Sequence, residues 1–292
     1  MMSRPYDLAI AYRIYPFVSK NPPLYPNDKL ALAAMCLHSF KASLGALRVK
    51  IWVILDTCPP EYKTLFSTCF DSEDITLIQL ERAGNAATFY RQLQVLINQS
   101  TADLVYLAED DYYYLPGQLE TMVHFLKERK DVDFITPYDH PDYYILGLHA
   151  DKKKAVVWKD KQWRRACTTC LTFLTTQSNL KEAQSMFMTY LQRNYDTSIW
   201  MSLTKEAALR PSTMYRALVN DHLWKAVVKT WRFGLRQILL GRRWKLWYPV
   251  PSIATHMDSS GMAPGIDWES YWRETLKQIE DSPQQATGPP LA

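Results

Sequence analysis

The sequence has no long hydrophobic run. A helix that crosses a membrane needs about 18 or more consecutive apolar residues, and no such stretch occurs among the 292 residues. The N-terminal segment MMSRPYDLAIAYRIYP is apolar only in short pieces, because Arg13 and Pro16 interrupt it, so it lacks the core of a signal peptide. We therefore expect no membrane span and a cytoplasmic location.

Cysteines are few and follow no pairing pattern. The chain has five, an odd number at scattered positions, which excludes the disulfide framework of small secreted domains. Cys167 and Cys170 have the C-x-x-C spacing of zinc and redox sites, but no second pair of close ligands accompanies them. We expect both to be structural and the protein to work in a reducing compartment.

The chain has little excess of one sign of charge, except in one segment. A net charge of +4 does not require a nucleic-acid partner, and we expect none. Residues 223–248, however, are rich in Lys, Arg and Trp and poor in acids. Such a segment could make a peripheral contact with an anionic membrane, close over a diphosphate or bind nucleic acid. An ordinary amphipathic helix with a solvated face explains it without any ligand.

Short apolar runs alternate with helical patterns through the first half of the chain. This alternation is typical of strands joined by crossover helices. Asn27 or Asp28 is placed to cap the first helix. The pattern predicts an α/β fold with a mostly parallel central sheet, whose ligands bind at the carboxyl ends of the strands. We expect these strands at residues 7–12, 50–55, 75–80, 103–108 and 132–136.

The second half has a different pattern. The run AVVW before Lys159-Asp160, and the run CLTFLTT after the basic segment 163–165, suggest a hairpin-like region. Ser178 or Asn179 can cap the helix that follows. A last helix is expected near residues 268–279, before a tail rich in Pro, Gln and Gly that we expect to be disordered.

Three adjacent carboxylates, Glu109, Asp110 and Asp111, follow the fourth expected strand directly. Their mutual repulsion makes joint burial costly unless a cation or hydrogen-bond donors compensate. Hard oxygen ligands favour Mg²⁺ or Mn²⁺, which can also hold the diphosphate of a nucleotide. A solvated acidic loop, or a helix start that favours negative charge, is the alternative.

The context of this triplet resembles a known family. The segment GNAATFYRQLQVLINQSTADLVYLAEDDYYYLPGQLETMVHFL is similar to the central signature of family 2 glycosyltransferases with the GT-A fold, in which a helix, a strand, a D-x-D motif and a Pro-started helix follow in order. Glu109 and Asp111 occupy the outer motif positions, with Glu in place of the commoner first Asp. The resemblance implies that Asp111 binds the metal, while Glu109 and Asp110 approach the ribose and the metal's waters.

Flanking positions extend the resemblance. Tyr12-Arg13 and Asp56 follow the first two expected strands, where the family contacts the nucleotide, and Arg82, Gly84 and Asn85 lie in a third such loop. The resemblance implies that Arg13 contacts the base or phosphate and Asp56 the base. A turn or helix cap is the alternative for Asp56. For Arg82, Gly84 and Asn85 the alternative is an ordinary loop that binds no ligand.

A histidine and an aspartate late in the chain complete the expected site. PVPSIATHMDSSGM resembles the segment in which many relatives carry a metal-binding histidine, which places His256 as a second ligand beside Asp111. Inverting members need a carboxylate that deprotonates the acceptor hydroxyl. Asp196, before SIWMSLT, is our candidate for this base, although it also suits a helix cap. The alternatives are Asp139, Asp142 and Asp221 with His222.

The resemblance implies a metal-dependent glycosyltransferase that moves a sugar from a nucleotide diphosphate, expected to be a UDP-sugar, with inversion. The acceptor would be a glycan, a lipid-linked or a small-molecule hydroxyl. Residues 1–136 would form the nucleotide-sugar-binding half, 137–280 the acceptor-binding remainder of one GT-A-like domain, and 281–292 the tail. The rivals are a non-catalytic nucleotide-sugar-binding protein and a nucleotidyltransferase that makes nucleotide sugars. Against the latter, residues 12–20 lack the Gly-rich phosphate loop.

Overall fold

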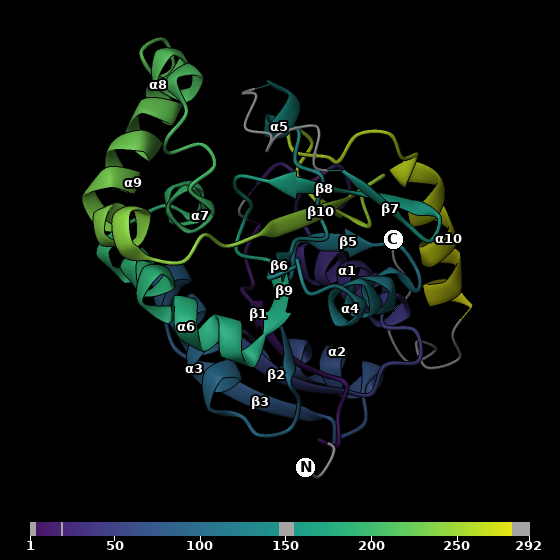
Figure 1. The fold of residues 1–292 in the computed structure, drawn as a ribbon. Helices are drawn as coiled ribbons and strands as arrows, with labels where there is room; N and C mark the ends of the chain where they lie inside the picture. The colour runs from purple at the N-terminus through teal and green to yellow at the C-terminus, as the bar shows by residue number, and fades with distance from the viewer. Residues whose placement is uncertain (1–3, 19, 146–154, 282–292) are drawn as a thin grey trace.

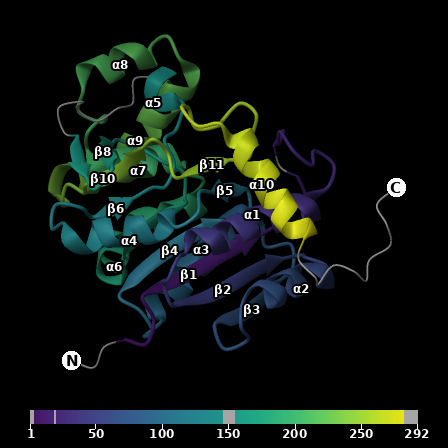
Figure 2. The same cartoon turned by 90° about the vertical axis from the view of Figure 1, so that its right-hand side faces the viewer.

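A computed structural model describes residues 4–18, 20–145 and 155–281. Its centre is a nine-stranded sheet, which Figures 1 and 2 show from two sides. In spatial order the strands are β3 (Ile75–Leu80), β2 (Val49–Asp56), β1 (Leu8–Ile14), β4 (Leu104–Glu109), β9 (Phe173–Thr176), β6 (Phe134–Ile135), β10 (Leu246–Val250), β8 (Lys161–Ala166) and β7 (Val156–Trp158).

Most strands of this sheet run in one direction. β3, β2, β1 and β4 pair in parallel, and β10 pairs in parallel with β6. Of the strands described in this sheet, β9 and β8 alone run opposite to the common direction. The expected α/β fold with a mostly parallel central sheet flanked by helices is therefore confirmed.

Helices cover both faces of the sheet. α1, α2, α4 and α10 pack on one face, and α3, α6 and α7 on the other. Asp28 caps α1 as expected, because its carboxylate accepts the N–H of Ala31 at 3.0 Å. The helices are α1 (Lys29–Ser43), α2 (Pro60–Cys69), α3 (Gly84–Asn98), α4 (Gln118–Glu128), α5 (Asp142–Ile145), α6 (Gln177–Phe187), the 3₁₀ helix η1 (Met188–Gln192), α7 (Asp196–Thr204), α8 (Pro211–Ala217), α9 (Asp221–Leu240) and α10 (Trp268–Glu280).

The second half departs from the expectations in two places. β7 and β8 form a hairpin with Lys159-Asp160 between them, as expected, and the basic segment 163–165 lies within β8, which also pairs with β10. The run CLTFLTT instead supplies β9, which inserts between β4 and β6. Neither Ser178 nor Asn179 caps α6, because Thr176 does so by accepting the N–H of Asn179 at 3.1 Å.

A short ribbon was not expected from the sequence. β5 (Tyr112–Tyr114) follows the acidic triplet and pairs antiparallel with β11 (Ala254–His256). The register sets His256 opposite Tyr112, so two segments over 140 positions apart in the chain meet beside Asp111. This pairing brings residues 254–256 to the triplet.

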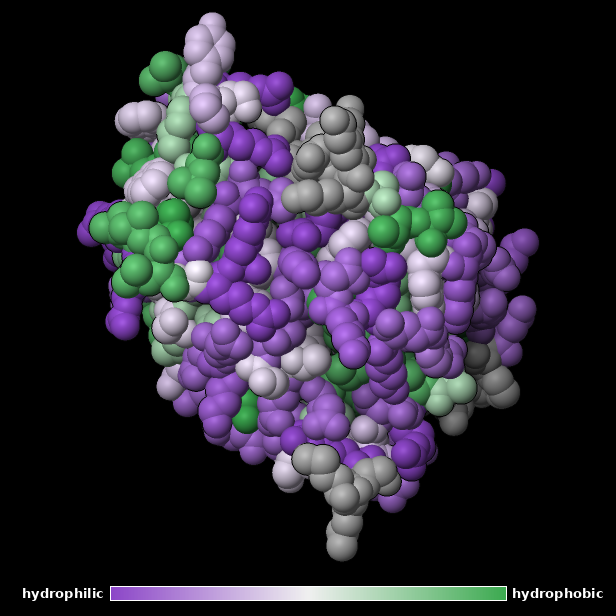
Figure 3. All heavy atoms as spheres, in the orientation of Figure 1, coloured by the Kyte–Doolittle hydropathy of each residue, from purple (hydrophilic) through white to green (hydrophobic). Residues whose placement is uncertain are grey.

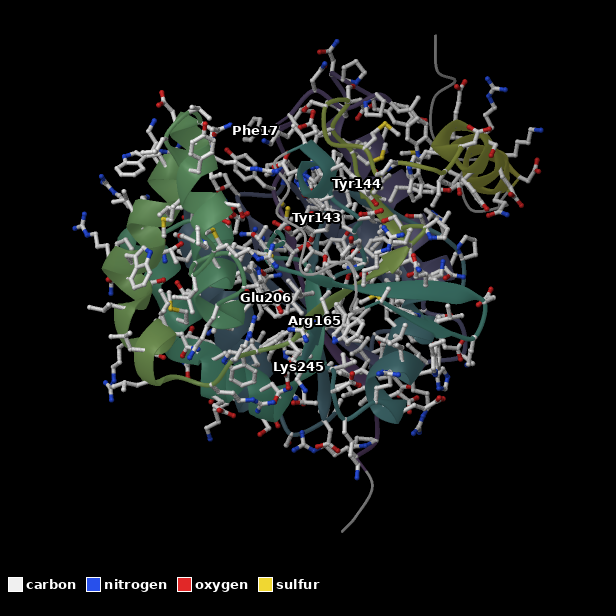
Figure 4. All side chains as sticks on the ribbon, turned by 45° about the horizontal axis from the view of Figure 1, so that its top comes forward. Phe17, Tyr143, Tyr144, Arg165, Glu206 and Lys245 are labelled. Carbon is white, nitrogen blue, oxygen red and sulfur yellow. The ribbon has the colours of Figure 1, made fainter. Side chains whose placement is uncertain are left out.

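Helices α7, α8 and α9 form an arm at one side of the sheet (Figure 1). A buried ion pair fastens it, because Arg165 on β8 lies 3.0 Å from Glu206, which follows α7 (Figure 4). None of the helices described is both long enough and apolar enough to cross a membrane. Residues 282–292, nearly all of the expected tail, lie outside the described residues.

Candidate functional site

Glu109 ends β4 and lies beside the end of β1. Because these strands are parallel, the register pairs Glu109 with Arg13, and the Arg13 guanidinium donates to the Glu109 carboxylate. The same guanidinium donates to the side chain of Asn85 and, at 3.1 Å, to its backbone carbonyl. Thr172 donates to the other oxygen of Glu109 at 2.7 Å. Glu109 is thus a paired carboxylate that joins β1, β4 and the approach to β9.

Asp110 forms a buried ion pair with Lys29, the first residue of α1. The Lys29 ammonium lies 3.0 Å from one carboxylate oxygen, and the backbone N–H of Tyr15 donates to that oxygen at 3.0 Å. Burial alone would lower the pKa of Lys29, but the carboxylates of Asp110 and Asp111 raise it above its ordinary value. Lys29 therefore stays charged and offsets part of the triplet's negative charge.

Asp111 faces His256. The imidazole Nε2 lies 3.0 Å from one carboxylate oxygen of Asp111, and the N–H of Met257 donates to the Asp111 backbone carbonyl at 2.7 Å. Burial by itself would raise the pKa of Asp111, but His256 holds it well below the ordinary value. Burial likewise opposes protonation of His256, yet Asp111 raises its pKa overall. The two side chains stabilise each other's charged forms.

One oxygen of Asp111 is buried and has no hydrogen-bond partner among the described residues. A buried carboxylate oxygen left unpaired is costly, so a cation or a hydrogen-bond donor at this point would stabilise it. Within the described ranges no three His, Cys, Asp or Glu side chains are grouped to hold a metal ion. Asp111 and His256 would supply two ligands, which fits a cation whose remaining positions are filled by water and substrate phosphate.

Asp56 ends β2, which pairs in parallel with β1 on one side and with β3 on the other. Its two oxygens accept the backbone N–H groups of Ala83 at 2.9 Å and Gly84 at 2.8 Å, and its side chain is buried. It thereby holds the β3–α3 loop against the strand ends. In this loop the exposed Arg82 has a φ of 50° and Gly84 a φ of 76°, both left-handed.

Asp196 begins α7 and lines a cavity of about 470 Å³. The cavity lies between the arm and the segments 140–143 and 168–170, and Tyr143, which lines it, is labelled in Figure 4. One Asp196 oxygen accepts the N–H of Thr197 at 2.6 Å. Despite this bond, burial raises the pKa of Asp196, and the nearby charge of Glu109 raises it further. A raised pKa is what a base near neutral pH requires.

The alternative acids lie in different settings. Asp142 and His222 line the same cavity, whereas Asp221 is exposed at the start of α9. Asp139 is only 1% exposed, accepts the Tyr144 hydroxyl at 2.7 Å with one oxygen, and has no described partner for the other. Burial raises the pKa of Asp139 to about 6.

Some members of this site were missed in the sequence. Tyr190 on η1 accepts a hydrogen bond from Asn85 at 2.9 Å, Thr172 contacts Glu109, and Lys29 contacts Asp110. Thr172 and Tyr190 come from segments with no local motif. Lys29 had one available signal, since it directly follows the expected cap of the first helix.

No protein-family model matches the chain, and no curated protein matches it. Solved structures resemble it. The mannosyltransferase PcManGT from Pyrobaculum calidifontis, in complex with GDP-Man and Mn²⁺, is 13% identical, with a TM-score of 0.46 over 83% of this chain and 70% of that one. A CMP:2-keto-3-deoxy-manno-octonic acid synthetase complexed with CTP is 11% identical, with a TM-score of 0.41 over 94% of this chain and 100% of that one.

S. aureus TarS in complex with UDP-GlcNAc is a third such structure. It is 11% identical, with a TM-score of 0.39 over 67% of this chain, and the chain spans about half of its length, 52%. Glycosyltransferases are thus among the proteins whose structures this chain resembles. At these identities the likeness assigns no activity, donor or acceptor to it.

Proposed function

We propose that this chain is a glycosyltransferase that moves a sugar from a nucleotide diphosphate, a UDP-sugar in the first instance, to a hydroxyl acceptor with the help of Mn²⁺ or Mg²⁺. The observation that carries the proposal is the convergence of Arg13, Asn85, the acidic triplet and His256 at the carboxyl ends of parallel strands. Ligands of open α/β sheets bind at this edge.

Asp111 and His256 are the proposed metal ligands. The unpartnered oxygen of Asp111 and the imidazole at 3.0 Å from the other oxygen provide a carboxylate and a nitrogen donor at one point. A divalent cation bound there would supply positive charge to a departing nucleoside diphosphate. Arg82 and Asn85, exposed in the β3–α3 loop, are the proposed nucleotide contacts. Arg13 and Asp56 hold that loop in place, because Arg13 donates to the Asn85 carbonyl and Asp56 accepts the N–H of Ala83.

The acceptor is proposed to enter the cavity that Asp196 lines. The Asp196 carboxylate takes the proton of the acceptor hydroxyl, the hydroxyl oxygen forms a bond to the anomeric carbon, and the bond from that carbon to the diphosphate breaks with inversion. In this assignment residues 1–136 carry the donor side and residues 137–280 the acceptor side. Support comes from the cavity, whose wall includes Cys170, Asp196 and His222 from the second half.

The test is metal-dependent breakdown of UDP-sugars by the purified chain. We expect UDP release with Mn²⁺, its loss in Asp111→Ala, and its retention in Asp160→Ala, which removes an exposed carboxylate in the β7–β8 turn. Release of pyrophosphate from UTP and a sugar phosphate would instead indicate the nucleotidyltransferase. Binding of UDP-sugar without any turnover, in the presence of a range of hydroxyl acceptors, would indicate the binding protein.

A further inference from the structure

Helix α9 carries a second apolar stripe besides the one that packs into the protein. The buried stripe consists of Leu223, Ala226, Val227, Thr230, Gly234 and Ile238. On the other side Trp224, Val228, Leu235 and Leu239 recur at helical spacing and are 48%, 44%, 50% and 64% exposed. These four lie on one line along the helix. An apolar line that remains exposed on a surface helix indicates a partner.

A basic line runs beside this exposed stripe. Lys225 and Arg236 directly follow two residues of the apolar line, and Arg232 lies one helical turn after a third. All three are exposed. Lys229 belongs to the same line, but its ammonium contacts the Arg193 carbonyl and lies over the Tyr195 ring. After Asp221 the helix has no acidic residue. The outer surface of α9 is therefore half apolar and half cationic.

The short helix α8 extends the same kind of surface. Tyr215 on α8 is 72% exposed, and Leu218 and Val219, in the turn between α8 and α9, are 72% and 81% exposed. Figure 3 shows hydrophobic residues gathered at the left of the view, over the arm that Figure 1 labels α8 and α9. We call the exposed side chains of α8 and α9 the α8–α9 face.

We propose that the α8–α9 face docks on the surface of an anionic lipid bilayer. Adjoining apolar and cationic lines are the features with which a helix lies in a membrane interface, apolar side chains among the acyl chains and cations among anionic headgroups. A second copy of this chain fits less well, because apposing two such stripes would bring two lines of positive charge together.

Docking would place the cavity next to the bilayer. Asn220, His222 and Leu223, from the cap and first turn of α9, line the cavity, and Trp224 on the next position begins the exposed stripe. If the proposed function holds, the acceptor is then a hydroxyl compound carried on a lipid. The docking itself rests only on the α8–α9 face and does not depend on catalysis.

The experiment is co-sedimentation of the full chain with vesicles of phosphatidylcholine alone and of phosphatidylcholine mixed with phosphatidylglycerol. We expect binding to the anionic vesicles to be at least about tenfold stronger and to fall with salt. The double variant Leu235→Glu/Leu239→Glu should lose at least about tenfold of that binding. Val157→Glu, which adds one such charge at an exposed position on β7, should bind like the unmodified chain.

Arg232→Gln/Arg236→Gln should weaken binding to anionic vesicles and leave the stripe intact. Circular dichroism and melting temperature must show that every variant is folded. Equal binding to both vesicles, or unchanged binding by the Glu double variant, would overturn the proposal. So would a concentration-dependent dimer that this variant abolishes. Stabilisation by UDP and Mn²⁺ should survive in all the variants, because none of the substituted residues belongs to the proposed nucleotide and metal site. Failure of docking is therefore distinguishable from failure of the proposed function.

Discussion

The acids of the triplet and the acids near the cavity differ in how their negative charge is balanced. In the triplet each carboxylate has its own cationic or imidazole partner, Arg13 for Glu109, Lys29 for Asp110 and His256 for Asp111. In the region of the cavity Asp139 and Asp196 make no ion pair within the described residues, and burial raises the pKa of both. Pairing with His256 holds the pKa of Asp111 well below its ordinary value, although burial raises the pKa of Asp110 despite Lys29. The pairing therefore favours an ionised Asp111 that can bind a cation, whereas the buried Asp196 is prepared to accept a proton.

The largest effect is expected at the base. Asp196→Asn removes proton acceptance but keeps size and the bond from Thr197, so turnover should fall roughly 10²–10⁴-fold. The measurement is the initial rate of sugar transfer or UDP release, with the melting temperature as a check on folding. UDP binding should be unchanged. If Asp139→Asn lowers the rate as much and Asp196→Asn does not, the base is Asp139 and the assignment of the cavity's acids is wrong.

The next effect concerns stability on the triplet side. Lys29→Met leaves Asp110 buried without its cation, which should lower the free energy of unfolding by about 3–5 kcal/mol. Urea denaturation followed by circular dichroism measures this loss. Lys63→Met, at an exposed position on α2, is the control and should be nearly neutral. A loss as small as that of the control would mean that the triplet does not need the paired cation.

The smallest effect is the pH dependence of stability that comes from Asp139, near the cavity. Because the pKa of Asp139 is about 6 in the folded chain and 3.8 is the ordinary value, folding takes up a proton between about pH 4 and 6. Stability should therefore fall as pH rises through this window and level off above it. Asp139→Asn should remove about 1–3 kcal/mol of that fall.

The check is a series of urea melts between pH 4 and pH 8, with Asp71→Asn as an exposed control. The two curves, for the unmodified chain and for Asp139→Asn, should converge at low pH and separate at high pH. Parallel curves would show that Asp139 has an ordinary pKa in the folded chain.

Much of the first half could be predicted because its signals are local. Apolar runs and the cap at Asp28 depend on neighbouring residues, and the structure has β1, α1 and β2 where they were expected. The position of the triplet at the end of β4 follows from the same pattern. Such signals reflect propensity and periodicity over a few turns.

The rest depends on pairing between distant segments, which no local pattern encodes. β9 fits between β4 and β6 although 37 or more residues separate it from either strand. The partners Thr172 and Tyr190 reach Glu109 and Asn85 only through that arrangement. His256 was placed near Asp111 by family resemblance alone, and the β5–β11 ribbon that brings it there had no recognised signal.

The central claim is that Asp111 and His256 hold a divalent cation together with the diphosphate of a nucleotide. The most direct measurement is the melting temperature of the chain with UDP, with Mn²⁺ and with both, in the unmodified chain, Asp111→Ala and Asp160→Ala. Since ligand binding stabilises the folded state by mass action, the account predicts a rise with UDP that requires Mn²⁺, is lost in Asp111→Ala and is kept in Asp160→Ala. The same rise without Mn²⁺, or in Asp111→Ala, would contradict it.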